Sequence, residues 1–236
     1  MNSNFNDIID VILTFSKDDE IKKDIVVYGS IVPYLITNKE SLNNILDFCF
    51  LVRKNRIDSI RKYLKKLSKD YKFDIIYDSK NYSNVDYGFN IKYENTIIGF
   101  FPYTIIDNNL TIRNFSISKD INEAKLKTKI ISNVSKNSII RYIKISDDIK
   151  VRIASPEFIL ASIETEEKKG KECEIEILTF LRNLSDENIL HALRESISKM
   201  RVNISYGRKK KIDYKFIIIV FILLMILAVL SYVCFK

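Results

Sequence analysis

The sequence predicts an α+β protein: a mixed β-sheet with flanking helices, a mainly helical C-terminal part and one C-terminal transmembrane helix. Three observations support this. Short apolar runs rich in β-branched residues, such as 25–28 and 45–52, have the composition of buried strands. Longer segments repeat their apolar residues at three- and four-residue steps, the period of a helix that buries one face. Residues 216–235 are apolar throughout, which is typical of a membrane span.

The composition narrows the class of protein. A chain of 236 residues, 47% of them hydrophobic, is long enough for one or two domains with a true core. The 5 glycines and 3 prolines are too few for a linker-dominated architecture. The 3 cysteines form no CxxC pair, and the 1 histidine excludes a site built from several histidines. A reduced, cytosolic compartment fits this cysteine usage best.

The N-terminal half alternates helices and strands before it turns to hairpins. Residues 2–21 form an amphipathic pattern, and a second, strongly basic one covers 55–68. Polar turns rich in Asn and Asp, at 94–95 and 107–109, separate three strands that we expect to pair as hairpins. The expected strands are 25–28, 45–52, 71–77, 87–93, 97–103 and 110–118, and a short helix is expected at 31–37.

The C-terminal half reads as mainly helical. We expect a helix over 121–134, a strand or irregular segment at 139–147, a short strand at 150–154, and helices over 156–168, 173–182 and 186–201. Ser155, Pro156 and Glu157 supply a cap, a first-turn proline and a first-turn acid, which together predict a helix start. The predicted domains are an α/β core (1–118), a helical subdomain (119–205), a basic juxtamembrane linker (206–215) and the transmembrane helix (216–235).

The stretch with the clearest chemical signal runs from residue 24 to residue 52. Its first strand ends in Gly29 and Ser30, which place backbone N–H groups and a hydroxyl where an anion could sit. The next strand carries one carboxylate, Asp47, within an apolar run. Burying a carboxylate is costly, so such a residue usually has a partner or a chemical role.

This arrangement resembles the nucleotidyltransferase fold, in its antitoxin and minimal-nucleotidyltransferase branch. The resemblance implies that the Gly29-Ser30 loop holds nucleoside triphosphate phosphates and that Asp47 binds Mg²⁺. In the family a second acid lies two residues further along the strand, where alternation points both side chains the same way. Cys49 occupies that position here, and a thiol is a poor ligand for Mg²⁺. We therefore expect catalysis to be impaired, and whether the chain is an enzyme stays open.

A second segment extends the resemblance to about residues 20–185. Residues 151–160, VRIASPEFIL, are similar to the helix entry that follows the sheet in the same branch. The family pattern continues with a lysine, then a basic-acidic pair and a later acid. Ile163 stands at the lysine position, and the register of the rest is open. The candidates are Lys171-Glu172 or Cys173-Glu174 for the pair, and Glu174 or Glu176 for the later acid.

The apolar run at 216–235 predicts a single-pass, tail-anchored membrane protein. About 20 apolar residues at 1.5 Å each cross a hydrocarbon core of about 30 Å. The positive-inside rule puts the basic side of the run, and with it the globular part, in the cytoplasm. The same basic residues favour anionic lipid headgroups. They are Arg208, Lys209, Lys210, Lys211 and Lys215.

Two of three function hypotheses concern the nucleotide site. In the first, the domain has lost efficient chemistry and binds a nucleotide or a protein partner. In the second, it is an active Mg²⁺-dependent enzyme that transfers a nucleotide to a protein or small molecule. Asp74 would then act as a further catalytic acid beside Asp47, with Asp86 or Glu94 as alternatives.

The third hypothesis is a membrane scaffold with a basic, nucleic-acid-binding face. The net charge of +8 permits it, although the charge is scattered along the chain and solvated helix faces explain most of it. Nucleic acid is therefore an unlikely partner. The patch would consist of Arg61, Lys62, Lys65 and Lys66.

Overall fold

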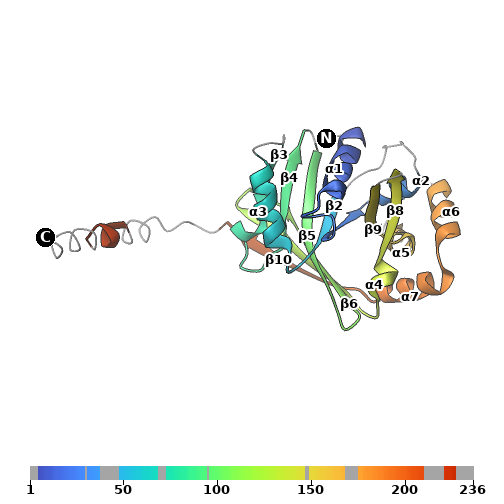
Figure 1. Ribbon diagram of the computed structural model, residues 1–236. Helices are drawn as coiled ribbons and strands as arrows, with labels where there is room; N and C mark the ends of the chain where they lie inside the picture. Colours follow the sequence, from blue (N-terminus) through green and yellow to red (C-terminus); the bar gives the residue numbers. More distant parts are fainter. Residues whose placement is uncertain are drawn as a thin grey trace.

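A single ten-stranded mixed sheet organises the protein, with helices on both of its faces (Figure 1). The computed structural model describes residues 5–29, 31–37, 48–68, 73–94, 96–146, 149–167, 175–209 and 221–226. The strands are β1 (Ile25–Gly29), β2 (Phe48–Arg53), β3 (Phe73–Asp78), β4 (Phe89–Tyr93), β5 (Thr96–Ile106), β6 (Asn109–Ile117), β7 (Glu123–Ile131), β8 (Ile140–Ser146), β9 (Ile149–Ala154) and β10 (Arg201–Arg208). The helices are α1 (Phe5–Lys17), α2 (Val32–Thr37), α3 (Ile57–Leu67), the 3₁₀ turn η1 (Ser79–Asn81), α4 (Lys136–Ile139), α5 (Pro156–Glu167), α6 (Ile175–Leu184) and α7 (Glu187–Ser198).

The strand order is β10-β7-β6-β5-β2-β1-β9-β8, and β4 and β3 extend from one end of β5. β1 and β2 are antiparallel, whereas β2 pairs with β5 and β1 pairs with β9 in parallel. β5 is long enough to change partners along its length, from β4 at Thr96–Phe100 to β6 at Tyr103–Ile106. Pro102 lies between the two pairings, where the N–H that proline lacks is not needed by either ladder.

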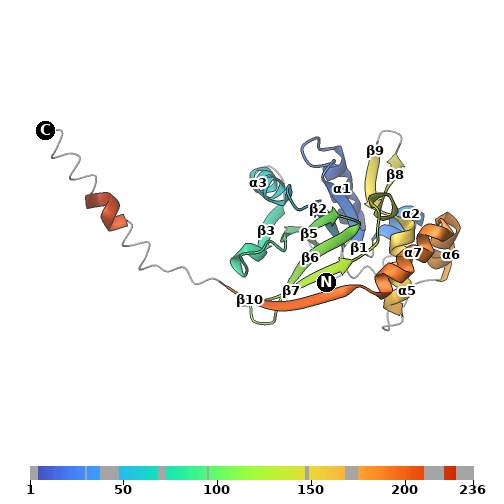
Figure 2. The same cartoon turned by 90° about the horizontal axis from the view of Figure 1, so that it is seen from below.

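Helices α1 and α3 cover one face of the sheet, and α5 with α7 covers the other (Figure 2). The amphipathic pattern of α1 places Phe15 edge-on against Phe50 and Phe100, with ring centroids 5.6 and 5.8 Å apart. On the opposite face Phe158 of α5 stacks on Tyr28 at 6.0 Å. Both contacts belong to one continuous hydrophobic core, which explains why the central strands are apolar on both sides.

The structure corrects the sequence expectation over 121–134. This segment is β7, which pairs with β6 on one side and with β10 on the other. Its apolar residues alternate with lysines, so its period is that of a strand. β10 was also not expected: α7 ends at Ser198, short of the predicted Arg201, and a strand follows.

The predicted domain boundary at residue 118 marks no break in the sheet. It falls in the turn between β6 and β7, which pair from Leu110↔Ile131 to Ile117↔Ala124. β9 and β10, from the predicted helical subdomain, also pair with strands of the predicted core. The helical part after residue 155 packs on this sheet through α5.

Candidate functional site

The predicted phosphate loop lies where β1 passes into α2. Gly29 has φ +105°, a left-handed conformation that glycine adopts without strain, so it ends the strand by turning the chain sharply. Ile31 and Val32 follow fully buried and fix the start of α2 against the core. Ser30, the predicted phosphate contact between Gly29 and Ile31, lies outside the described residues, as does Asp47, the residue before β2.

Cys49 occupies the position of the second metal-binding acid in the resembled family. It pairs with Tyr28 of β1 and with Gly99 of β5, so its side chain lies in the middle of the sheet. The thiol is 4% exposed and donates a hydrogen bond to the carbonyl oxygen of Tyr28 at 3.5 Å. The side chain at this position is thus a small, buried hydrogen-bond donor, whereas the acid of the resembled family is an ionised acceptor.

Aromatic rings occupy the space around Cys49. A Cβ at Gly99 would lie 2.5 Å from the ring of Phe101. Glycine at this position therefore leaves room for that ring beside Cys49. Phe101 also contacts Phe115 edge-on, with centroids 6.3 Å apart. Neither β2 (FCFLVR) nor β5 (TIIGFFPYTII) carries a carboxylate. The described strands on this part of the sheet thus provide an apolar surface.

Asp74, the other predicted catalytic acid, lies far along the same sheet. It is exposed on β3, opposite Lys92 of β4. β4 and β5 separate β3 from β2, a lateral distance of about 14 Å at the usual strand spacing. Oxygens that share one Mg²⁺ lie within about 2 Å of the ion, so an acid on β3 does not reach a metal held at β2.

The two alternative acids are placed differently. Asp86 accepts two hydrogen bonds of 2.8 Å from the guanidinium of Arg61 and one from the backbone N–H of Gly88. Glu94 is in the turn between β4 and β5, with φ +48°. Among the described residues, no group of three His, Cys, Asp or Glu side chains is arranged to hold a metal ion.

Arg61 forms a buried charge cluster that sequence reasoning missed. Its guanidinium pairs with Asp58, Asp78 and Asp86, and it lies 5.0 Å from the ring centroid of Phe89. Lys80 adds a second cation, and its hydrogen bond lowers the pKa of Asp58. The cluster ties α3 to the segment between β3 and β4. Arg61 points inward, so it is not part of the predicted basic patch, whose Lys62, Lys65 and Lys66 are exposed.

The Ser-Pro-Glu segment begins α5 as predicted. The Ser155 hydroxyl accepts a hydrogen bond from the backbone N–H of Phe158 at 3.0 Å and donates one to the Ser138 carbonyl at 2.5 Å. Glu157 is 2% exposed and accepts from Arg141 and from the backbone N–H of Asp186, both at 3.2 Å. These contacts join β8, α5 and the start of α7, which gives the motif a structural role. The predicted residues 171–174 lie outside the described part of the chain.

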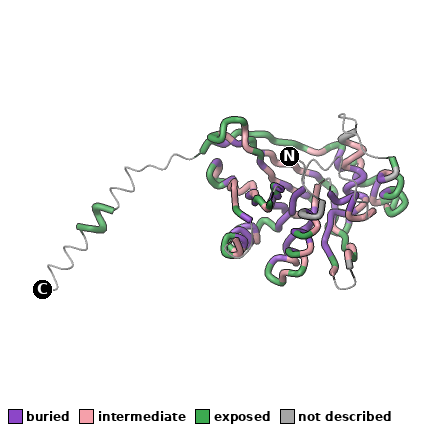
Figure 3. Tube along the Cα trace, turned by 90° about the horizontal axis from the view of Figure 1, so that it is seen from above, coloured by how far each residue is buried: buried purple, intermediate pink, exposed green. Residues whose placement is uncertain are grey.

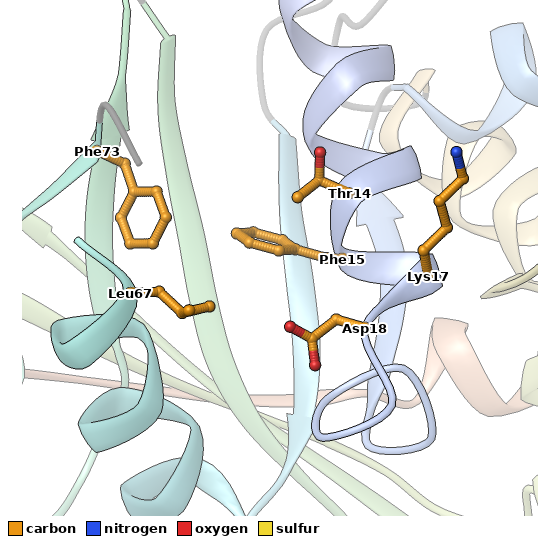
Figure 4. A pocket seen from close by; sticks show the side chains of 6 residues that line it. All are labelled: Thr14, Phe15, Lys17, Asp18, Leu67 and Phe73. Atoms are coloured by element: carbon orange, nitrogen blue, oxygen red, sulfur yellow. The ribbon is translucent and has the colours of Figure 1, made fainter. Parts of the chain in front are cut away.

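A small pocket lies on the face of the sheet opposite Cys49 (Figure 4). Its volume is about 190 Å³, and it is lined by Thr14, Phe15, Lys17, Asp18, Leu67 and Phe73. Phe15 and Phe73 face one another across it, whereas Lys17 points away. Asp18 accepts a hydrogen bond from the Tyr63 hydroxyl at 2.8 Å. The pocket is separated from Gly29 and Cys49 by the sheet itself.

The basic cluster before the apolar run is partly described. Arg208 ends β10 exposed, and the backbone N–H of the exposed Lys209 donates to the carbonyl of Asn122 at 2.7 Å. Lys210 and Lys211 lie outside the described residues. Within the expected span only 221–226 are described, as an exposed helical turn. None of the described helices has the length and apolarity needed to cross a membrane.

Comparison with known proteins finds a similarity of structure and none of sequence. No protein family profile and no curated protein matches the sequence. Among solved structures, the chain is similar to the solution structure of the antibiotic-resistance factor ANT(2'')-Ia, with a TM-score of 0.47 and 11% sequence identity. The alignment covers 84% of this chain and 93% of that one. The fold itself is a mixed α+β fold with a large mixed sheet and helices on both faces.

Proposed function

We propose that this chain is a membrane-anchored protein whose domain keeps a nucleotidyltransferase-like architecture and binds a nucleotide or a protein partner without efficient nucleotide transfer. The order β1, Gly29 turn, α2 and antiparallel β2 supports the architecture. The observation that carries the loss of chemistry is Cys49. A buried thiol that donates to the Tyr28 carbonyl replaces the second acid of the resembled family.

The described residues do not fit the Mg²⁺ that the resemblance implies. Mg²⁺ requires near-octahedral coordination by hard oxygen ligands, and the thiol of Cys49 is soft and buried. The strand next to β2, β5, offers no carboxylate, and Asp74 is three strands away from β2. Asp47 is therefore proposed as a lone acid beside the Gly29-Ser30 turn.

The test is a nucleotide-labelling assay with the full chain in detergent or vesicles, supplied with nucleoside triphosphates and Mg²⁺ or Mn²⁺. We expect no label transfer to protein or small-molecule acceptors, and triphosphate binding that does not depend on the metal. Asp47→Ala and Asp74→Ala form a matched pair of acid-to-alanine variants. Label transfer by the wild type that is lost in Asp47→Ala and kept in Asp74→Ala would establish the active enzyme instead.

The anchoring part of the proposal rests on the 20-residue apolar run and the basic residues before it. In cells, the full chain should stay with the membrane pellet after high-salt and alkaline washing. A chain that ends at residue 209 should move to the supernatant. Release of the full chain by salt alone would mean that electrostatic attraction holds it to the membrane and that no segment is inserted.

A further inference from the structure

β10 is an edge strand with an exposed apolar row. Among the described strands it pairs with β7 alone, and it runs along the outside of the sheet (Figures 2 and 3). Every second side chain is apolar: Val202 is 38% exposed, Ile204 50% and Tyr206 62%. These three residues therefore share one face of the strand and present an apolar row to solvent.

The neighbouring strand adds a row of lysines to the same face. The register pairs Val202 with Lys129, Ile204 with Lys127 and Tyr206 with Lys125. Residues directly opposite each other in an antiparallel pair lie on the same face of the sheet. We call the surface formed by these six residues the β7–β10 face. It combines three cations with two aliphatic side chains and a tyrosine.

The reverse side of these two strands is covered at one end. Ala124 and Leu126 of β7 are buried there in a small cluster with Phe115 and Tyr82. A side chain added at Gly207 of β10 would lie 2.6 Å from the carbonyl oxygen of Tyr82. The segment that contains Tyr82 therefore packs on the reverse side at Gly207, whereas Asn203 and Ser205 on that side are exposed. The β7–β10 face is the side of the strand pair that carries the exposed apolar row.

We propose that the β7–β10 face lies against the anionic surface of the bilayer and sets the orientation of the domain on the membrane. This inference rests on the proposed anchoring. β10 leads into residues 209–215, which reach at most about 25 Å when fully extended. The face is therefore held close to the headgroups by the apolar run that follows. Its charge is complementary to acidic lipids, and tyrosine is a side chain favoured at headgroup depth.

The contribution of the lysines follows from their number. A lysine near an acidic membrane surface favours the bound state by about fivefold, so three together favour it by roughly 100-fold. This attraction is screened within about 10 Å at moderate salt, whereas an inserted span does not depend on salt. Docking of the face and insertion of the anchor can thus be measured separately.

The absence of tryptophan allows a site-specific reporter, because an introduced indole is the only one in the chain. Tyr206→Trp places it on the β7–β10 face. Tyr142→Trp is the matched control, since Tyr142 is 67% exposed on β8 at the opposite edge of the sheet. The full-length variants are reconstituted into vesicles of phosphatidylcholine with or without phosphatidylserine, and emission and quenching by brominated lipid are recorded.

We expect blue-shifted, bromine-quenched emission from Tyr206→Trp only in vesicles that contain phosphatidylserine, and no change from Tyr142→Trp. Reversing the charge of Lys125, Lys127 and Lys129 to glutamate should remove the effect, whereas the same change at Lys62, Lys65 and Lys66 of α3 should not. Thermal unfolding verifies that each variant is folded.

Two results would overturn the inference while leaving the anchoring intact. One is a chain that resists alkaline washing while the reporter at position 206 remains solvent-exposed, which would leave the anchor intact and refute only the docking. The other is a blue shift without bromine quenching in both lipid mixtures, which would indicate pairing of β10 with a second copy. A chain that washes off the vesicles altogether would refute the anchoring, and the inference with it.

Discussion

Replacing Arg61 by methionine should destabilise the domain more than any other single change to a charged residue of α3. The substitution keeps an apolar side chain of similar length and removes the guanidinium, which lies over the ring of Phe89. Three carboxylates lose their common partner: Asp78 at 2.9 Å, Asp86 at 2.8 Å and Asp58. Asp78 and Asp86 are only 22% and 17% exposed, so solvent replaces little of what they lose.

The expected cost follows from this burial. Removing one member of a buried ion pair costs about 3–5 kcal/mol, because the remaining charge stays desolvated and unpaired. Lys80 offsets part of this, since it lies 3.8 Å from Asp86 and also pairs with Asp58. For a domain of this size 1 kcal/mol corresponds to about 2–4 °C, so the melting temperature should fall by roughly 6–20 °C.

The assay is thermal unfolding of the full chain followed by circular dichroism. Lys65→Met is the control, because Lys65 is exposed on the same helix, and it should shift the transition by less than about 2 °C. Adding Asp86→Asn to Arg61→Met should cost less than the sum of the single changes, since the two side chains share one interaction. Equal stability of Arg61→Met and Lys65→Met would refute the reasoning.

Three further changes have defined outcomes. A hydrogen bond from Arg194 lowers the pKa of Glu164 below its ordinary 4.5, so this pair stabilises the fold above that pH. Between about pH 5 and pH 3 the free energy of unfolding of the wild type should therefore fall more steeply than that of Glu164→Gln, and parallel curves would contradict this. Gly88→Ala should cost more than about 2 kcal/mol in chemical denaturation, because φ is +100° and the new Cβ would overlap the Phe100 carbonyl oxygen at 2.0 Å. Cys49→Asp should lower the melting temperature without metal and regain it in part with Mg²⁺. Cys49→Ser should show no response to Mg²⁺, and a response in both variants would place the metal elsewhere.

Local chemistry made part of the fold predictable. The hairpin between β5 and β6 turns at Asp107 and Asn108, whose φ values of +48° and +58° are ones that these residue types tolerate. The turn after β1 requires Gly29 for the same reason. The Ser155 cap and the buried strands could also be predicted, because each depends on residues that are close together in the sequence.

Interactions between segments that are distant in the sequence could not be predicted. Lysines at alternate positions of β7 resemble the charged face of a helix until β10, more than seventy residues later, is known to pair with it. Arg61 reads as one of a series of helix-surface cations, and only the fold brings Asp86 within 2.8 Å of it. The neighbours of Cys49 come from β1 and β5, so the apolar setting of the predicted site was equally hidden.

If the chain is anchored as proposed, the attachment of β10 has a mechanical consequence. β10 pairs with β7 along its whole length, from Arg201↔Ile130 to Arg208↔Glu123. Tension applied at Arg208 along the strand axis would load the hydrogen bonds of this ladder together. Bonds loaded in parallel share the force, whereas a strand peeled sideways would break them one at a time. A pull along β10 is therefore the direction in which this ladder would resist best.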